Sequence, residues 1–359
     1  MVKPEKLTFK RFFICNNAGR EKFTALAIFL FAALTACVRA PQWRTADGAA
    51  WGTTYHISYS GDRDLSDSVI AVMRDVERAV SMFDPTSNVS LVNAGITDSV
   101  GPVFAEVFNR SRHISQLSAG YFDPTVAPLV DLWGFGRKKD VKETPDSARV
   151  TQALASVGIA NCYITDDGRI VRKSPSTEFD FSAIAKGYGV DAVADMLRRN
   201  GCTDFMVEIG GEVRVSGHNP RGDEWRLQID DPVASGRDGH VRLAVVNLTD
   251  AALATSGNYR NFKEMPDGRL VTHTLSAITG YPAESDVLSV SVIAPDCMTA
   301  DGLATACMAM PTDRAKAMIG RLSGVSALFV ISLPDGGYKV ETAGETKYWG
   351  QIAMPEDKR

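Results

Sequence analysis

Asp301 and Thr305 are the two side chains whose types and spacing point most directly to chemistry. They lie four residues apart in segment 300–305 (ADGLAT), so on a helix they share one face and can reach the same ligand. A carboxylate and a hydroxyl are hard oxygen donors, the kind of ligand that Mg²⁺ prefers. The alternative is structural: Thr299 caps the helix, and Asp301 only favours its positive end.

Lys186 lies in a second segment suited to chemistry, the small-residue run 180–189 (DFSAIAKGYG). An acid, a turn of small residues and a lysine stand where a helix is expected to start. Such a turn offers backbone N–H groups and a positive charge to a phosphate. The spacing is neither that of a Walker loop nor that of a Rossmann fingerprint. Close packing of helices explains the small residues equally well.

His273 and two glycine turns are further candidates. The histidine stands in segment 271–275 (VTHTL) at an apparent strand end, where it can act as a base or donate a hydrogen bond to a phosphate. It is one of five histidines, and most histidines are only polar side chains. Segments 210–211 (GG) and 255–259 (TSGNY) read as ordinary turns when each is taken alone.

Helices and strands must position these residues, and the spacing of apolar residues predicts both in irregular alternation. The predicted helices are 65–80, 102–120, 145–158, 180–201, 299–310 and 312–322. The predicted strands are 51–59, 205–209, 225–229, 241–248, 287–294, 327–331 and 338–340. Several strand pairs are close in sequence, so we expect an α+β fold with mainly antiparallel sheets packed with helices. The length favours a single large domain of two fused lobes.

The N-terminal segment reads as a bacterial lipoprotein signal. A basic region precedes the apolar run 23–34 (FTALAIFLFAAL), which is too short to span a bilayer and has the length of a signal-peptide core. The run ends in 34–37 (LTAC), so cleavage would leave Cys37 as a lipidated first residue. We expect a lipid anchor on the periplasmic face of a bacterial membrane. The alternative is an ordinary secretory signal and a soluble product.

This interpretation divides the chain into four parts. They are a signal peptide at 1–36, a lipidated tether at 37–46, the folded domain at 47–350 and a C-terminal tail at 351–359. Removal of the signal takes away six basic and two acidic side chains, so the formal net charge changes from −4 to −8. Such a surface does not attract nucleic acid by bulk charge.

Four cysteines remain once Cys15 and Cys37 are set aside. They are Cys162, Cys202, Cys297 and Cys307. An oxidising compartment permits disulfides, but the spacings do not demand them. We expect mostly buried free thiols, with one bridge allowed.

The candidate segments form an ordered series along the chain. They are 51–53 (WGT), 81–83 (SMF) with Asn93, 120–126 (GYFDPTV), 132–136 (LWGFG), 180–191, 209–211 (IGG), Trp225 with 231–232 (DP), 255–257 (TSG), His273 with 279–280 (TG), and 301–305. This series resembles the ApbE family of FAD:protein FMN transferases over nearly the whole chain after the signal. The resemblance implies an enzyme that binds FAD and Mg²⁺, transfers FMN to a threonine hydroxyl of another protein and releases AMP.

The resemblance also implies roles for individual residues. The metal ligands would be the carbonyl oxygen of Ala183 and the side chains of Asp301 and Thr305. His273 would act as the base in the transfer step, with Lys186 and Asp301 as the other catalytic residues. The flavin nucleotide would contact Trp51, Phe83, Tyr121, Phe122, Asp123, Asp180, Lys186 and Leu275.

Two departures from the family pattern bear on activity. Trp51 stands where the family usually has methionine, and Ser276 and Ala277 replace the usual Asp-Pro, which removes a carboxylate near the proposed site. Two other functions fit the same residues: an FAD pyrophosphatase that yields FMN and AMP, and a noncatalytic periplasmic FAD-binding lipoprotein. By resemblance, the protein partners would be membrane redox flavoprotein subunits with an acceptor threonine.

Overall fold

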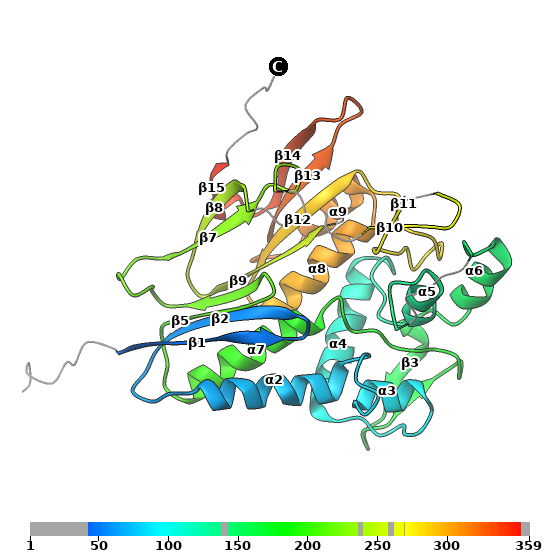
Figure 1. The fold of residues 1–359 in the computed structure, drawn as a ribbon, viewed down its shortest axis with the longest axis horizontal. Helices are drawn as coiled ribbons and strands as arrows, with labels where there is room; N and C mark the ends of the chain where they lie inside the picture. The colour runs from blue at the N-terminus through cyan, green and yellow to red at the C-terminus, as the bar shows by residue number, and fades with distance from the viewer. Residues whose placement is uncertain (1–41, 138–142, 236–239, 258–261, 269, 353–359) are drawn as a thin grey trace, which may run out of the picture. The chain divides into compact units, whose positions relative to one another are not determined.

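An eight-stranded sheet is the largest element of the fold (Figure 1). The structure is a computed structural model, which describes residues 42–137, 143–235, 240–257, 262–268 and 270–352. The strand order of the sheet is β1-β2-β5-β6-β9-β12-β13-β14, and every neighbouring pair is antiparallel. The strands are β1 (Trp43–Ala50), β2 (Thr53–Ser60), β5 (Phe205–Ile209), β6 (Glu212–Ser216), β9 (Ala251–Gly257), β12 (Val287–Ala294), β13 (Ser326–Ser332) and β14 (Tyr338–Gly344).

A three-stranded sheet packs on one face of the large sheet. It consists of β7 (Trp225–Asp230), β8 (Arg242–Leu248) and β15 (Trp349–Ile352), with β8 in the middle. Val215 of β6 and Val330 of β13 share a buried apolar core with Leu248 of β8. Side chains alternate between the two faces of a strand, so the neighbours of these valines point to the other face.

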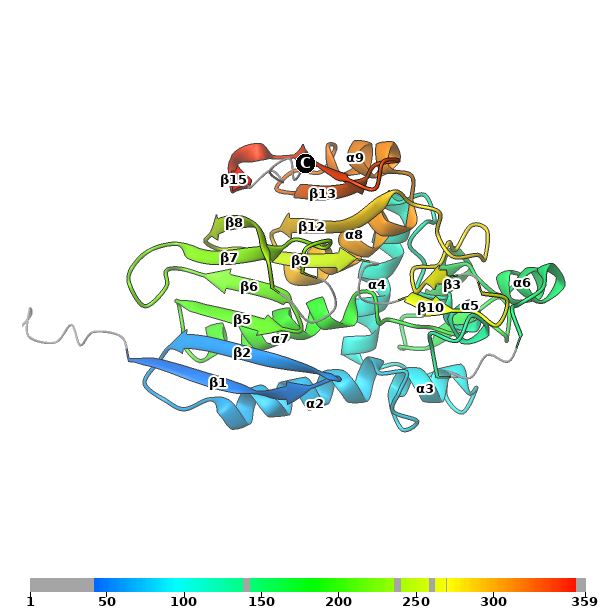
Figure 2. The same ribbon diagram turned by 45° about the horizontal axis from the view of Figure 1, so that its top comes forward.

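Helices cover that other face, and they lie behind the large sheet in Figure 2. They are α2 (Ser66–Val80), α4 (Pro102–Leu117), α7 (Ala185–Arg199) and α8 (Cys297–Ala309). Val292 of β12 and Phe329 of β13 share a core with Leu303 of α8. Because α8 is buried on nearly every side, its sequence is apolar around the whole circumference. An acid in such a helix, Asp301, requires compensation by a partner.

A second, smaller core lies beside these layers. It is built from α5 (Ala127–Leu132), α6 (Ser147–Leu154) and the hairpin of β10 (Phe262–Glu264) and β11 (Leu270–Thr272). Its buried side chains are Leu129, Trp133, Val150, Met265, Val271 and Leu275. The remaining elements are α3 (Asn88–Asn93), the 3₁₀ turns η1 (Ile159–Asn161) and η2 (Thr346–Tyr348), the hairpin β3 (Cys162–Ile164) and β4 (Ile170–Arg172), and α9 (Thr312–Ile319).

The structure confirms the α+β class, and each predicted helix and strand has a counterpart. From Trp43 onward the chain forms one unit. The predicted helix 180–201 begins only at Ala185. The preceding residues form a turn in which the Asp180 carboxylate accepts a hydrogen bond from the Ser182 N–H at 2.8 Å. Lys186 therefore lies at the start of α7.

Two domain boundaries differ from the prediction. The tether was expected to reach residue 46, but β1 begins at Trp43, because Ala46 is buried and the Arg44 guanidinium donates a hydrogen bond to the Gly61 carbonyl at 3.2 Å. At the other end, β15 runs to Ile352, two residues beyond the predicted end of the domain. The signal peptide and Cys37 lie outside the described residues.

Two further observations concern the cysteines and the length of the helices in the described residues. Cys162, Cys202, Cys297 and Cys307 are all buried and free, as predicted for most of them. Among the described helices, none has both the length and the apolar character needed to cross a membrane.

Candidate active site

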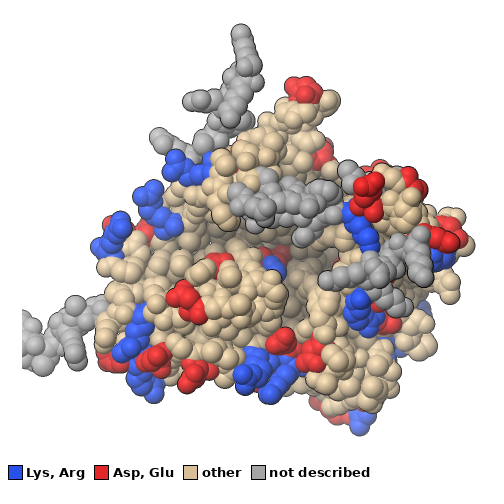
Figure 3. All heavy atoms as spheres, viewed as in Figure 1, with Lys and Arg blue, Asp and Glu red and all other residues tan. Residues whose placement is uncertain are grey.

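A cavity of about 1200 Å³ lies where α7, α8, the strand ends of the large sheet and the second core meet. Nearly all of the predicted site residues line it: Phe83, Tyr121, Phe122, Asp123, Asp180, Ala183, Lys186, His273, Leu275, Asp301 and Thr305. In Figure 3 the surface is hollowed near the centre of the view, and charged atoms of both signs are visible there. Residues far apart in sequence therefore meet in one place.

An ion pair between Lys186 and Glu212 forms part of the cavity wall. The Lys186 Nζ lies 2.5 Å from Glu212 Oε2, and the glutamate side chain is only 4% exposed. Burial raises the pKa of Glu212 to about 7, although the lysine charge opposes this shift. Burial alone would lower the pKa of Lys186, but the attraction of Glu212 and Asp301 outweighs it and raises that pKa. The lysine is therefore charged and held in place at the start of α7.

Asp301, Thr305 and Ala183 present three oxygen donors to the same part of the cavity. The Thr305 hydroxyl donates a hydrogen bond to the Ala183 carbonyl at 3.4 Å, and Asp301 lies one helical turn before Thr305 on α8. Asp301 Oδ2 accepts a hydrogen bond from the Gly187 N–H at 2.9 Å. Burial raises the pKa of Asp301, while Lys186 and that N–H group oppose the shift.

These donors fit a hard divalent cation. No group of three His, Cys, Asp or Glu side chains suited to a metal occurs in the described part of the chain. A single buried carboxylate with a hydroxyl and a carbonyl instead matches Mg²⁺, which keeps several ligands for water and phosphate oxygens. A cation beside Asp301 would also offset the cost of its buried charge.

Asp123 lines the cavity, but its carboxylate is engaged in holding the local backbone. Oδ1 accepts hydrogen bonds from the Thr125 N–H at 2.8 Å and hydroxyl at 2.5 Å, and Oδ2 accepts from the Ile159 N–H at 2.9 Å. Burial raises the pKa of Asp123, and these hydrogen bonds oppose the shift. Asp123 thus fixes the turn that follows Phe122, whose own side chain is buried.

Asp180 is a second buried acid in the wall. Its backbone N–H donates to the Pro124 carbonyl at 2.6 Å, which joins the turn before α7 to the turn that Asp123 holds. Burial raises the pKa of the Asp180 carboxyl, and the hydrogen bonds from Ser182 oppose the shift. The two turns therefore form one continuous wall.

Aromatic side chains at the cavity differ in exposure. Phe83 is 61% exposed, so it offers an uncovered ring face to a planar ligand. The Tyr121 hydroxyl lies 3.4 Å from Arg314, which donates a hydrogen bond to it. These two rings remain candidates for contact with a flavin.

Trp51 packs on α7, and its predicted contact with the flavin stays a prediction. It is not among the described residues that line the cavity. Its ring instead packs on α7, where a Cβ atom at Gly189 would lie 2.1 Å from the indole. Trp51 has a positive φ of 54°, and it joins the two main helical cores. Its role is packing of β1 and β2 against α7.

His273 lies at the cavity directly after β11. Its neighbours two residues away on either side, Val271 and Leu275, are both buried in the second core, which fixes the backbone of the histidine. The ring of Phe135 contacts the imidazole edge to face, with 6.5 Å between ring centroids. The second core therefore presents His273 to the residues on α7 and α8.

Ser276 follows in a tight turn and explains one departure from the family pattern. Its hydroxyl accepts hydrogen bonds from the N–H groups of Ile278 at 3.3 Å and Thr279 at 3.1 Å, and its N–H donates to the Tyr281 carbonyl at 2.8 Å. A serine hydroxyl does here what an aspartate carboxylate does in an Asx turn. Ser276 does not appear among the described cavity-lining residues, so the missing carboxylate leaves that wall unchanged.

Three charged residues among the described cavity-lining residues are absent from the predicted site: Glu212, Asp230 and Lys263. Glu212 had an available signal. It directly follows Gly210-Gly211 and opens β6, where Glu212 and Arg214 alternate with buried valines. Charged residues on the helix-facing side of a strand indicate a buried polar network.

Comparisons with known proteins agree on one family. Residues 51–329 match the model of the ApbE family. A protein of Haemophilus influenzae named FAD:protein FMN transferase is 30% identical over 337 residues, which cover 90% of this chain and 96% of that protein. One of the same name from Vibrio cholerae is 34% identical over 327 residues and 88% and 95% of the two chains.

Solved structures give the same result. The flavin transferase ApbE from Vibrio cholerae superposes with a TM-score of 0.75 and 32% identity, covering 84% of this chain and 97% of that chain. The apo form of the Pseudomonas stutzeri flavinyl transferase ApbE gives a TM-score of 0.74 and 30% identity, with 85% and 96% covered. Sequence and structure both cover most of the described domain, and the chain therefore belongs to the ApbE family.

Proposed function

We propose that this protein is a Mg²⁺-dependent FAD:protein FMN transferase, which moves FMN from FAD to a threonine hydroxyl of a target protein. The relatives named FAD:protein FMN transferase support this activity. The proposal rests on one observation. A single cavity is lined by the Lys186 ammonium group, which Glu212 holds in place, and by the three oxygen donors of Ala183, Asp301 and Thr305. A diphosphate requires such a combination of positive charge and metal ligands.

The size and walls of the cavity support a dinucleotide substrate. Its volume of about 1200 Å³ exceeds the roughly 300–1,000 Å³ of common small-ligand pockets. Phe83 and Tyr121 offer aromatic faces to the flavin ring, and Asp180 lies at the start of α7 near Lys186. The positive end of α7 favours an anion at this point.

The transfer exchanges one phosphoester for another. The threonine oxygen forms a bond to the FMN phosphorus, the bond from that phosphorus to the AMP oxygen breaks, and the threonine proton passes to His273. Ala183, Asp301 and Thr305 would hold Mg²⁺, which when bound neutralises charge on the diphosphate. Lys186 shares that charge through its ammonium group, and Glu212 keeps the ammonium in place.

We also propose that the protein acts at the periplasmic face of a bacterial membrane. The motif LTAC at residues 34–37 supports a lipid on Cys37, because acyl chains would hold the enzyme at the membrane without a spanning helix. The targets would be membrane redox flavoprotein subunits with an outward-facing threonine. Neither the lipid anchor nor the target protein involves nucleic acid.

The experiment that tests the activity follows the FMN and AMP products together. Purified protein is incubated with FAD, Mg²⁺ and a flavoprotein subunit as acceptor, and AMP, free FMN and protein-bound FMN are measured. We expect one bound FMN for each AMP, and no bound FMN with His273→Ala. AMP with an equal amount of free FMN, even with acceptor present, would identify a pyrophosphatase. FAD binding without AMP would identify a noncatalytic binding protein.

A further inference from the structure

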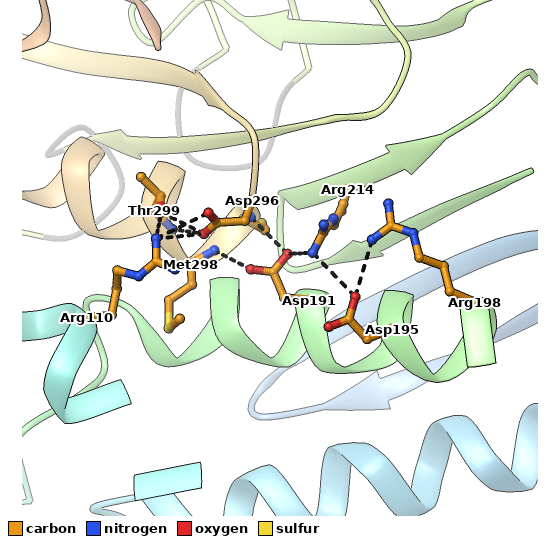
Figure 4. Close-up of polar contacts among 9 residues, drawn as sticks. Arg110, Asp191, Asp195, Arg198, Arg214, Asp296, Met298 and Thr299 are labelled. Carbon is orange, nitrogen blue, oxygen red and sulfur yellow. Dashed lines mark hydrogen bonds and ion pairs between the residues drawn. The ribbon is translucent and has the colours of Figure 1, made fainter. Parts of the chain in front are cut away.

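Asp191 is a buried acid outside the cavity, on the side of α7 that faces α8. Its Oδ1 lies 2.6 Å from the Arg214 Nη1 and accepts a hydrogen bond from the Cys297 N–H at 2.9 Å. Its Oδ2 accepts from the Met298 N–H at 2.8 Å (Figure 4). The residue is only 7% exposed, so these charged and polar partners compensate its burial.

The start of α8 is thus held by two acids from different parts of the chain. The first N–H groups of a helix have no partner within the helix. Asp296, the N-cap, accepts a hydrogen bond from the Thr299 N–H at 2.8 Å. Asp191 on α7 accepts hydrogen bonds from the two preceding N–H groups of the helix, those of Cys297 and Met298. Arg110 of α4 holds Asp296 in turn at 3.2 Å (Figure 4). The position of the first turn of α8 therefore depends on α7.

A second contact joins the two helices four residues earlier on α7. The Gly187 N–H donates to Asp301 Oδ2 at 2.9 Å. A Cβ atom at Gly187 would lie 2.4 Å from the Cys297 carbonyl oxygen and 2.8 Å from the Asp301 Cβ. Only glycine allows this approach without displacement. The helices are therefore held at both ends of one short stretch, by Gly187 and by Asp191.

Strand β6 fixes α7 at the same two levels. Glu212 and Arg214 are two residues apart, so they point to the same face of the strand. Glu212 pairs with Lys186, and Arg214 pairs with Asp191. One face of β6 thus holds both the charged end of α7 and the residue that caps α8.

We propose that Asp191 is a positioning residue that sets the separation between Lys186 on α7 and the ligands Asp301 and Thr305 on α8. This inference rests on the proposed function of the cavity, because it assigns a catalytic consequence to that separation. Asp191 itself does not touch the cavity, among the described residues that line it. Replacing this carboxylate by an amide removes the charge that pairs with Arg214 and turns one of the two acceptors at the start of α8 into a donor, so α8 shifts relative to α7.

The test compares Asp191→Asn with Asp195→Asn as a matched control. Asp195 lies one turn further along α7, 3.8 Å from the same arginine, and its side chain is 51% exposed. Its ion pairs in the described structure are with Arg198 and Arg214, neither of which lies on α8 (Figure 4). For each full-length protein we would measure kcat, KM for FAD, and the Mg²⁺ concentration for half-maximal transfer. Thermal unfolding of the FAD-bound protein would be followed over the same Mg²⁺ range.

We expect Asp191→Asn to lower kcat and raise the half-maximal Mg²⁺ concentration, each at least tenfold, with a change in KM for FAD below threefold. Its Mg²⁺-dependent rise in Tm should shift to higher Mg²⁺ by the same factor. Asp195→Asn should stay within twofold of wild type in all of these. Asp191→Glu, which keeps the charge, should recover part of the kcat and serves as the test variant if Asp191→Asn does not fold.

A lower Tm with unchanged kcat and unchanged Mg²⁺ dependence would reduce Asp191 to a stability role and overturn the proposal. Equal changes of kcat and Mg²⁺ dependence in Asp195→Asn and Asp191→Asn would also overturn the proposal. Wild-type protein without any transfer would instead contradict the proposed function. The Mg²⁺ dependence of Tm would then still decide whether Asp191 positions the oxygen donors, since that measurement needs no acceptor.

Discussion

Among single residues, Asp301 bears most of the proposed activity. It is 4% exposed inside an apolar helix, and it keeps its place through the Gly187 N–H and the charge of Lys186. A buried acid that costs stability is retained where it serves function. The four-residue spacing of Asp301 and Thr305 suggested a shared ligand from sequence, with a structural role at the helix start as the alternative.

Asp301→Asn should therefore remove transfer and leave the fold intact. Asparagine keeps the shape and the acceptor for Gly187 but loses the charge that a cation requires. We expect a fall in kcat of at least about a hundredfold, as for loss of one essential electrostatic group. Steady-state assays of folded protein, checked by circular dichroism, measure this. Asp313→Asn, at an exposed acid on α9, should retain the wild-type rate; wild-type rates in Asp301→Asn would contradict the metal assignment.

Ser276 offers a test of the turn after His273. Ser276→Ala removes the acceptor of two N–H groups, so it should lower the free energy of unfolding by about 1 kcal/mol and reduce kcat. Ser276→Asp supplies a stronger acceptor and should match or exceed wild type in both. Chemical denaturation and transfer assays measure these effects. Equal stability of Ser276→Ala and wild type would show that the hydroxyl does not hold the turn.

Two residues show where sequence reasoning stopped at this scale. Trp51 was assigned to the flavin by resemblance, and the packing of its ring over Gly189 of α7 was not predicted. Local sequence does not reveal which distant glycine a side chain will meet. Glu212 was overlooked because a single glutamate in a strand reads as an exposed residue. Only the approach of Lys186 from another element makes it part of the site.

Among the elements, α7 and α8 determine the geometry of the site. Lys186 lies in the first turn of α7, and α8 carries both side-chain oxygen donors. Their contact at Gly187 is close enough that the Cys297 carbonyl occupies the space of a side chain. Small residues in segment 180–189 had two explanations from sequence. The structure supports close helix packing for Gly187, next to the lysine that faces the cavity.

Gly187→Ala should test this packing. Alanine favours a helix by roughly 1 kcal/mol over glycine, but its Cβ would lie 2.4 Å from a backbone oxygen that cannot change rotamer. The steric clash should outweigh the gain in helix propensity, so we expect a net loss of about 1–3 kcal/mol in unfolding free energy and a lower transfer rate. A stable, active Gly187→Ala would refute the close-contact argument.

Prediction of the elements succeeded where the pattern was strong and failed where another layer altered it. The helix 65–80 shows clear three- and four-residue spacing, and α2 matches it. β9 (AALATSG) was missed because alanine and glycine have low strand propensity. β6 was missed although Glu212 and Arg214 alternate with buried valines in it. Strand order could not be predicted, since it depends on contacts far apart in sequence.

The whole molecule combines a folded domain with an N-terminal segment of a different kind. The described residues begin at Gln42, five residues after the predicted lipid attachment point. Cys37→Ala should prevent lipidation, so the protein should move from the membrane fraction to the soluble or precursor fraction. Its purified domain should keep the transfer rate of wild type, because the described cavity-lining residues all belong to the folded domain. Fractionation followed by immunoblotting measures this, and equal membrane association of both proteins would contradict the lipid anchor.

The central claim is that the cavity transfers FMN to protein. The most direct test is the intact mass of a purified acceptor subunit after incubation with this enzyme, FAD and Mg²⁺. We predict a mass increase equal to FMN less one water, located by fragmentation on a single threonine. The increase should be absent when that threonine is replaced by valine or when Asp301→Asn is used. An unmodified acceptor beside accumulating free FMN and AMP would contradict the claim.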